Sequence, residues 1–330
     1  MERNGKMGKI LITASHYHEL CADARELLES RGHELMINES ALPYYTFQQL
    51  AEVVGNIDAA VVGLDEWTEE VFRMAPRLKV IAKFGVGTDN IDCDTAKEYG
   101  IKVINAPGQN SNAVAELTVG FMIQLLRNIL PLYEGIRQGQ WVRYIGGELK
   151  GKTVGLFGFG AVAKLVAKKL SSFETEVIAC DLHPDSEYAK KYNVGLVSAE
   201  EVVERSDILS VHLPATSATY HLVDKAMISK MKRGACMINC ARGAVVDTKA
   251  LTEALKSGYL AGAALDAFET EPLPADSLLL TCDNVICTPH TGAETYEAYR
   301  NVSLCTAQGI LDVLEGREPL YWVNRTGGTI

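Results

Sequence analysis

The sequence predicts an α/β fold built from two doubly wound parallel sheets. Short β-branched runs alternate with helical patterns along the chain, which is the rhythm of strands and helices in a parallel sheet. This alternation is interrupted by a passage that contains Pro131 and four glycines between 135 and 147, and it resumes at Thr153. The length of 330 residues also favours two domains, each with a core of its own.

The first half of the chain contains four runs that predict strands, at 9–13, 59–63, 78–84 and 102–105. Helical stretches such as ADARELLESRG separate them. A long helix is expected to follow Asn112 and to end near Arg127. The passage from Pro131 to Gly147 is expected to be rich in loops.

The second half contains six further runs, at 153–157, 176–180, 208–212, 235–239, 261–265 and 284–288. The stretch TKALTEALKSG is expected to be a helix with Asp247 or Thr248 as its N-cap and Gly258 as its stop. A last helix is expected in ETYEAYRNVSLCTAQGILDVLEG. We therefore expect two doubly wound units that separate near residue 105 and join again near residue 295.

The composition argues against several classes of protein. The net charge is −10 and no block of like charges occurs, which argues against a nucleic acid as partner. The apolar stretch 114–132 contains Glu116, Gln124 and Arg127, so it predicts a buried helix and not a membrane span. The N-terminal MERNGKMGKILIT lacks the apolar core of a signal peptide. Eight cysteines without a CxxC pair indicate reduced thiols in a cytoplasmic protein, and no metal site is predicted.

A glycine-rich turn predicts a dinucleotide site. Gly158, Gly160 and Ala163 form the pattern G-x-G-x-x-A between a predicted strand and an amphipathic helix. The first glycine makes a tight turn, the second lets the backbone approach a pyrophosphate, and the third position needs a small residue. The next strand ends at Asp181, whose carboxylate suits an adenosine ribose and would repel a 2′-phosphate. The pattern therefore predicts NAD and not NADP.

Five successive strands of the second half are followed by polar or ionisable residues. Each of these residues alone is more often a capping or packing residue. Ligands of open α/β sheets sit beyond the carboxyl ends of the strands, so the clustering favours a functional edge. The residues are Asp181, His212, Asn239 to Arg242, Asp266 and His290.

Three kinds of side chain near this edge suit the reduction of a carbonyl group. A nicotinamide supplies the hydride, so the protein must hold the substrate and move one proton. A histidine such as His290 can move that proton near neutral pH, and a carboxylate beside it, expected within 266–271, favours the protonated ring. A guanidinium such as that of Arg242 can bind a carboxylate and polarise the neighbouring carbonyl.

The motifs resemble those of the D-isomer-specific 2-hydroxyacid dehydrogenases, and most of all their D-3-phosphoglycerate dehydrogenase branch. The resemblance spans nearly the whole chain. It implies NAD as the cofactor and reversible hydride transfer between NAD(H) and a small 2-keto or D-2-hydroxy acid. It rests on GLFGFGAVA, NCARGAVVD, AGAALDAFETEP and NVICTPHTGAE, with GVGTDNID at 85–92 and NSNAVAELTVG at 110–120.

The resemblance also implies roles for individual residues. The implied catalytic residues are Arg242, His290 and Glu271, the glutamate that precedes proline, and not Glu269. Arg242 and His290 are also implied to bind the substrate, together with the backbone of Val86 and Gly87. The implied cofactor-binding residues are Gly158, Gly160, Ala161, Val162, Asp181, His212, Pro214, Thr219, Cys240, Ala241, Arg242, Asp266, His290 and Gly292.

The resemblance further implies the domain organisation. The substrate domain would consist of residues 1–105 and 296–330, with an NAD-binding Rossmann domain inserted at 106–295. A homodimer joined mainly through the NAD domains is implied. The chain is expected to be a short form, without the C-terminal regulatory domains of longer family members.

Two departures from the family pattern bear on the ligands. Ala161 stands where the family often has arginine, which predicts at most weaker cofactor binding. Gly63 stands where phosphoglycerate dehydrogenases usually have arginine, and the neighbouring Asp65 and Glu66 disfavour a substrate phosphate. Lys83 could partly replace the missing cation. Hydroxypyruvate, glyoxylate, 3-phosphohydroxypyruvate and larger keto acids therefore all stay open as substrates.

Two other functions share part of this set of residues, that of an NAD-sensing protein and that of a formate dehydrogenase. An NAD-sensing protein, like the co-repressors that share this fold, could keep the arginine, glutamate and histidine. It would show NADH-dependent oligomerisation without turnover. Formate dehydrogenases carry glutamine where this chain has Glu271, so the glutamate argues against that activity.

Overall fold

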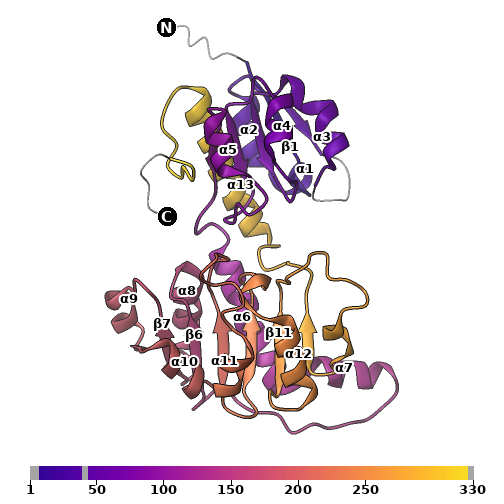
Figure 1. The fold of residues 1–330 in the computed structure, drawn as a ribbon, viewed down its shortest axis with the longest axis vertical. Coiled ribbons are helices and arrows are strands. Elements are labelled where there is room, and N and C mark those ends of the chain that lie inside the picture. The colour runs from indigo at the N-terminus through magenta and orange to yellow at the C-terminus, as the bar shows by residue number, and fades with distance from the viewer. Residues whose placement is uncertain (1–6, 39–43, 326–330) are drawn as a thin grey trace. The chain divides into compact units, whose positions relative to one another are not determined.

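The chain forms two compact α/β units (Figure 1). The structure, a computed structural model, describes residues 7–38 and 44–325. Unit 1 consists of Met1–Asn110 and Glu294–Ile330, and unit 2 is the inserted segment Ser111–Ala293. Each unit contains one parallel sheet, so the predicted fold class is confirmed.

The sheet of unit 1 has five parallel strands in the order β2-β1-β3-β4-β5. Successive residues of these strands point to opposite faces, and both faces are buried, as in other parallel sheets covered by helices. Helices α1, α2 and α13 pack on one face, and α3, α4 and α5 pack on the other. The elements are β1 (Lys9–Ile12), α1 (Tyr17–Leu20), α2 (Ala22–Glu29), β2 (Glu34–Ile37), α3 (Phe47–Val53), the 3-10 helix η1 (Val54–Asn56), β3 (Ala59–Val62), α4 (Glu69–Met74), β4 (Val80–Lys83), α5 (Cys93–Glu98), β5 (Lys102–Ile104) and α13 (Tyr296–Leu314).

The sheet of unit 2 has seven parallel strands in the order β12-β11-β10-β9-β6-β7-β8. Its strands are β6 (Thr153–Phe157), β7 (Glu176–Cys180), β8 (Val194–Leu196), β9 (Ile208–Val211), β10 (Cys236–Asn239), β11 (Gly262–Leu265) and β12 (Val285–Cys287). Its helices are α6 (Ser111–Arg127), α7 (Ile129–Arg137), α8 (Ala161–Leu170), α9 (Ser186–Lys191), α10 (Ala199–Arg205), α11 (Lys225–Lys230), η2 (Gly243–Val245), α12 (Thr248–Lys256) and η3 (Leu278–Thr281).

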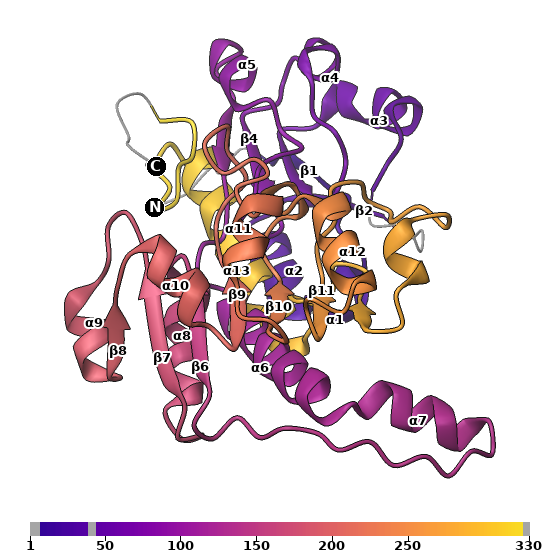
Figure 2. The same cartoon turned by 60° about the horizontal axis from the view of Figure 1, so that its bottom comes forward.

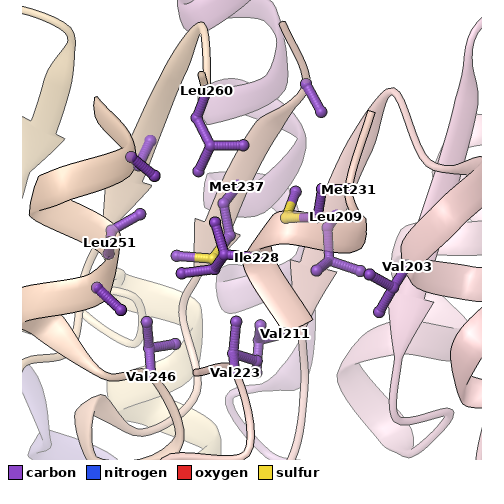
Figure 3. Packing of buried hydrophobic residues seen from close by; sticks show 14 of the residues in the cluster. Val203, Leu209, Val211, Val223, Ile228, Met231, Met237, Val246, Leu251 and Leu260 are labelled. Atoms are coloured by element: carbon purple, nitrogen blue, oxygen red, sulfur yellow. The ribbon is translucent and has the colours of Figure 1, made fainter. Parts of the chain in front are cut away.

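Two apolar clusters cover the two faces of this sheet. Helices α6 and α8 contribute to one cluster, and α10, α11 and α12 contribute to the other. Figure 3 shows the second cluster, in which Met237 of β10 lies among Leu209, Ile228 and Leu251. All four side chains are at most 3% exposed, so the strands that lead to the carboxyl edge rest on a close-packed core.

The helix predicted after residue 247 is confirmed in detail. Asp247 is its N-cap, and its carboxylate accepts the N–H of Ala250 at 3.0 Å. Gly258, with a φ of 65°, follows the helix end in the left-handed conformation that favours glycine.

Three sequence-based expectations were incomplete. The passage from Pro131 to Gly147 is not all loop, because α7 occupies Ile129–Arg137. Pro131 lies in the first turn of α7, where a backbone N–H has no helical partner to lose. Strands β2 and β8 were missed because they are short, with four and three residues, and their apolar runs are too brief to stand out from the surrounding sequence.

Within the described ranges, no single helix is long and apolar enough to cross a membrane. Helices α6 and α7 meet that criterion only as a pair, with a bend of 64° between them. The same ranges contain no group of three histidine, cysteine or acidic side chains that could hold a metal ion.

Candidate active site

The carboxyl edge of the unit 2 sheet brings the predicted polar residues together. All seven strands are parallel, so the segments that follow them leave the sheet at one edge. In the order of the strands from β12 to β7, these segments carry His290, Asp266, Asn239 to Arg242, His212, Gly158 and Asp181.

The glycine turn after β6 has the shape that a pyrophosphate needs. Gly158 has a φ of 98°, and an added Cβ would lie 2.7 Å from the carbonyl oxygen of His212, so only glycine fits there. A Cβ added at Gly160 would meet nothing within 4 Å, which leaves open space in front of the turn. Helix α8 begins at Ala161, so the amides of Ala161 and Val162 lie in its first turn without helical acceptors. The turn therefore fits an anionic ligand.

Asp181 lies exposed at the end of β7, beside the glycine turn. Its Oδ2 accepts the N–H of Phe159 at 2.7 Å, and its Oδ1 accepts the N–H of His183 at 2.8 Å. Each carboxylate oxygen has a second lone pair, so the side chain can still accept bonds from ribose hydroxyls.

His290 and Glu271 form a hydrogen-bonded pair. The Nδ1 of His290 lies 2.8 Å from the Oε2 of Glu271, and the Oε1 of Glu271 accepts the N–H of Phe268 at 2.9 Å. Burial raises the pKa of Glu271, but the hydrogen bonds from His290 and Phe268 outweigh it and hold that pKa below its ordinary value. The charge of Arg242 acts in the same direction. The structure thus brings the three predicted catalytic residues into one electrostatic cluster.

Asn239 shapes the segment that carries Arg242. This buried side chain accepts the N–H of Ala241 at 3.0 Å and donates to the carbonyl of Arg242 at 2.9 Å. The guanidinium of Arg242 donates to the carbonyl of Ala241 at 2.9 Å. The half-buried Arg242 is therefore held at a fixed place after β10.

Asp266 is a buried connector between two segments of the edge. Its Oδ1 accepts bonds from the hydroxyl of Thr288 and, at 2.8 Å, from the N–H of Thr291. Its Oδ2 accepts the N–H of Gly292 at 2.7 Å. The side chain is 3% exposed, so in this structure Asp266 fixes the segment around His290. Sequence reasoning missed this role of Asp266, although Thr288 and Thr291, on either side of His290, are typical of a hydrogen-bonded loop.

The remaining predicted cofactor residues lie around the same edge. The Nε2 of His212 lies 2.9 Å from the hydroxyl of Ser210, and burial lowers the pKa of His212 to about 4. Thr219 donates from its hydroxyl to the carbonyl of Pro214 at 2.6 Å, which closes the loop after β9. Burial raises the pKa of Cys240 to about 12, so its thiol is neutral.

In unit 1 the predicted substrate residues follow β4. Val86 is 40% exposed, and its carbonyl accepts a bond from the side chain of Asn105 at 2.7 Å. Lys83, at the end of β4, is buried, and its ammonium donates to the carbonyl of Gly63 and to Asn90.

Asp65 adds a buried carboxyl to this part of unit 1. It accepts bonds from the hydroxyl of Thr13 and the N–H of Tyr45. Burial raises the pKa of Asp65 above its ordinary value, although those bonds and the charge of Lys83 act in the opposite direction. The charge of Lys83 is thus engaged within unit 1 by Gly63, Asn90 and Asp65.

Comparison with known proteins identifies the family. The sequence model described as "D-isomer specific 2-hydroxyacid dehydrogenase, NAD binding domain" matches residues 119–292. A D-3-phosphoglycerate dehydrogenase of Methanocaldococcus jannaschii is 41% identical over 314 residues, which cover 94% of this chain and 58% of that protein. A glyoxylate reductase of Thermofilum pendens is 42% identical over 268 residues, 79% of each chain. This chain thus spans little more than half the length of the first of these relatives.

Solved structures agree with these relatives. The TT0316 protein of Thermus thermophilus superposes with a TM-score of 0.85 at 33% identity, over 96% of this chain and 99% of that one. The D-lactate dehydrogenase of Escherichia coli does so with a TM-score of 0.84 at 28% identity, over 96% and 100%. The predicted cofactor, NAD, agrees with the NAD-binding domain that the family match covers. The chain belongs to the D-isomer-specific 2-hydroxyacid dehydrogenase family.

Proposed function

We propose that this chain is an NAD-dependent dehydrogenase that interconverts a small 2-keto acid and the corresponding D-2-hydroxy acid. The observation that carries the proposal is the His290–Glu271 pair with Arg242, at the carboxyl edge of an NAD-binding sheet. The relatives named D-3-phosphoglycerate dehydrogenase, glyoxylate reductase and hydroxypyruvate reductase support this class of reaction. Unit 2 is proposed as the NAD domain and unit 1 as the substrate domain.

His290 is the proposed proton donor. When NADH is bound, it supplies the hydride for the carbonyl carbon. The Nδ1 of His290 is bonded to Glu271, so Nε2 is the nitrogen that gives the proton to the carbonyl oxygen. The hydrogen bond to Glu271 fixes the orientation of the His290 ring. In the oxidation direction the same nitrogen accepts the proton.

Arg242 is the proposed anchor of the substrate carboxylate. A guanidinium binds a carboxylate through two parallel hydrogen bonds and also polarises the adjacent carbonyl. In unit 1, the backbone of Val86 and Gly87 is proposed as a further substrate-binding element. Ala241, which precedes Arg242, is a small residue that leaves space for ligands, whereas Gly243 makes room for the backbone of Phe268 and Glu269.

The proposed cofactor contacts follow the order of the strands. The amides of Gly160, Ala161 and Val162 would hold the pyrophosphate, and Asp181 the adenosine ribose. The loop with His212, Pro214 and Thr219 would cover the adenine side. Cys240, Ala241, Asp266, His290 and Gly292 would surround the nicotinamide.

The structure of unit 1 favours a substrate without a phosphate. A phosphate carries close to two negative charges and needs cations that can reach it. Lys83 is buried and directs its ammonium to Gly63 and Asn90, with Asp65 nearby. Hydroxypyruvate and glyoxylate therefore fit this unit better than 3-phosphohydroxypyruvate.

A homodimer joined through unit 2 is also proposed. Helix α7 and the segment after it expose large apolar side chains, among them Ile136, Tyr133 and, at 86%, Trp141. Figure 2 shows this helix and segment extending away from the sheet of unit 2. Exposed apolar surface of this kind marks an interface.

The eight cysteines form no disulfide, which supports the proposed location in the reducing cytoplasm.

The test is a panel of NADH oxidation assays with glyoxylate, hydroxypyruvate, 3-phosphohydroxypyruvate and a larger 2-keto acid. We expect turnover with an unphosphorylated acid at least about 100-fold above the phosphorylated one, a difference of about 2.7 kcal/mol. Arg242→Ala should lose turnover and still bind NADH. NADH-dependent oligomerisation with no turnover on any acid would instead indicate an NAD-sensing protein and overturn the proposal.

A further inference from the structure

The loop after β11 carries two glutamates, and each one binds a histidine. Glu271 binds His290, the proposed proton donor. Glu269, two residues earlier, has no part in the proposed reaction, yet its Oε2 lies 2.6 Å from the Nε2 of His221. The two side chains are partly buried, with exposures of 30% for His221 and 28% for Glu269. The loop is therefore held at two neighbouring points.

The carboxylate of Glu269 joins three segments of unit 2. Its Oε1 accepts the N–H of Thr248 at 2.8 Å, at the start of α12. Its Oε2 binds His221, in the segment between β9 and α11. Burial raises the pKa of Glu269, but the hydrogen bonds from Thr248 and His221 outweigh it and hold that pKa below its ordinary value. The carboxylate is thus ionised at neutral pH and bonds strongly to both partners.

His221 is itself fixed by the segment that follows Arg242. Its backbone N–H donates to the carbonyl of Ala244 at 2.8 Å. Its φ of 49° is uncommon for a residue with a side chain and persists only where surrounding contacts hold it. Its ring stacks on the ring of Tyr220, with 4.0 Å between the centroids.

Gly243 brings the two segments into direct contact. A Cβ added there would lie 1.9 Å from the carbonyl carbon of Phe268 and 2.3 Å from the nitrogen of Glu269. The N–H of Phe268 in turn donates to the Oε1 of Glu271 at 2.9 Å. The place of the backbone at 268–269 therefore sets the place of the Glu271 carboxylate.

We propose that His221 and Glu269 are a positioning pair for the reaction. They hold residues 266–272 against the segment of Arg242, and this contact aligns Glu271 with His290. Neither residue touches the reacting atoms. The inference rests on the proposed function for its catalytic consequence, whereas the alignment of His290 can be measured without any substrate.

The test uses His221→Ala and Glu269→Ala in the full chain. Small displacements of a catalytic group lower turnover, so kcat on the best keto acid should fall about 10-fold in each variant. The KM for NADH should stay within about twofold, because the glycine turn is untouched. The double variant should lose no more than either single variant, since both remove one interaction. A kcat within about twofold of wild type in both single variants would overturn the proposal.

Two matched variants separate positioning from loss of stability. His221→Gln places a side-chain N–H within reach of Glu269 and should restore at least half of the wild-type kcat. Lys225→Ala breaks an exposed ion pair between Lys225 and Glu253, 2.9 Å long and away from the loop, and should leave kcat unchanged. An equal loss of kcat in Lys225→Ala, or no recovery in His221→Gln, would overturn the proposal.

The second readout is the NMR signal of the His290 ring in the free protein. His221→Ala should shift this signal, because the Glu271 carboxylate moves, whereas Lys225→Ala should not. An unshifted signal would overturn the positioning role. A wild-type protein that reduces none of the keto acids would overturn the proposed function, and the His290 signal would still decide whether His221 positions Glu271.

Discussion

Two histidine–glutamate pairs have their glutamates on one loop of unit 2 and have similar nitrogen–oxygen distances, although His290 bonds through Nδ1 and His221 through Nε2. The nitrogen–oxygen distance is 2.8 Å in His290–Glu271 and 2.6 Å in His221–Glu269. Both glutamates have a lowered pKa, and both accept one backbone N–H through their second oxygen. The pairs differ in what surrounds them.

The backbone partner of each glutamate shows the difference. Glu271 accepts the N–H of Phe268 within its own loop, and the charge of Arg242 acts on it. Glu269 accepts the N–H of Thr248, which begins a helix on another segment. The His290–Glu271 pair thus lies beside the charge of Arg242 at the sheet edge. The His221–Glu269 pair connects separate segments of unit 2 by hydrogen bonds. The same two residue types are therefore proposed to take a chemical role in one place and a positioning role in the other.

The largest expected effect is the loss of the His290 ring. His290→Ala removes the proposed proton donor, and general acid catalysis contributes roughly 10²–10⁴-fold to such rates, so kcat should fall about 10³-fold. The fall expected for His221→Ala is only about 10-fold. NADH affinity, measured by fluorescence titration, should stay near wild type in both variants. Equal losses of kcat in the two variants would contradict the assignment of proton donation to His290 and of positioning to His221.

Exchange of each carboxylate for an amide should give the next largest effect. Glu271→Gln removes the carboxylate that accepts the hydrogen bond of the His290 ring and orients it, and kcat should fall about 100-fold. Glu269→Gln keeps an oxygen for the Thr248 amide and a polar group for His221, so kcat should stay within about threefold. Steady-state assays at one pH suffice. A greater loss in Glu269→Gln than in Glu271→Gln would reverse the roles given to the two glutamates.

The contact at Gly243 should matter for stability. Gly243→Ala forces a Cβ against the backbone at 268–269, and such overpacking costs about 1–3 kcal/mol of the free energy of unfolding. Gly160→Ala is the matched control, because nothing lies within 4 Å of the added Cβ, and its free energy of unfolding should change by less than about 1 kcal/mol. Urea unfolding measures both. Equal stability of the two variants would mean that the segments are not in contact at Gly243.

Sequence reasoning predicted those features that depend on local pattern or on strand order. The cap at Asp247 and the stop at Gly258 follow from local chemistry. The meeting of Arg242 and His290 at one edge follows because parallel strands share a carboxyl end. Helix α7 was missed because Pro131 reads as a helix breaker, although the first turn of a helix tolerates it.

The second histidine–glutamate pair could not be predicted. His221 and Glu269 are 48 residues apart, and neither follows a strand directly. Their contact depends on the left-handed backbone of His221 and on the close approach at Gly243, which are properties of the loop paths. The structural role of Asp266 was missed for a related reason, since the threonine and glycine donors reach it from a separate segment.

The smallest expected effect is the acid dependence of stability. A carboxyl whose pKa is lower in the folded chain than in the unfolded chain stabilises the fold above the unfolded value of about 4.3, and this contribution is lost as the pH falls through the folded pKa. Glu269 and Glu271 both belong to this class. Between about pH 5 and about pH 3, the free energy of unfolding should therefore fall less steeply in Glu269→Gln and Glu271→Gln than in wild type.

Urea unfolding of the two single variants and the double variant across this range would compare the pairs directly. Both carboxylates are partly exposed, so solvent screening keeps each change small. Because the two pairs hold one loop, the double variant should flatten the slope by less than the sum of the single variants. An additive result would mean that the pairs act independently, and it would argue against the transmission of position from Glu269 to Glu271.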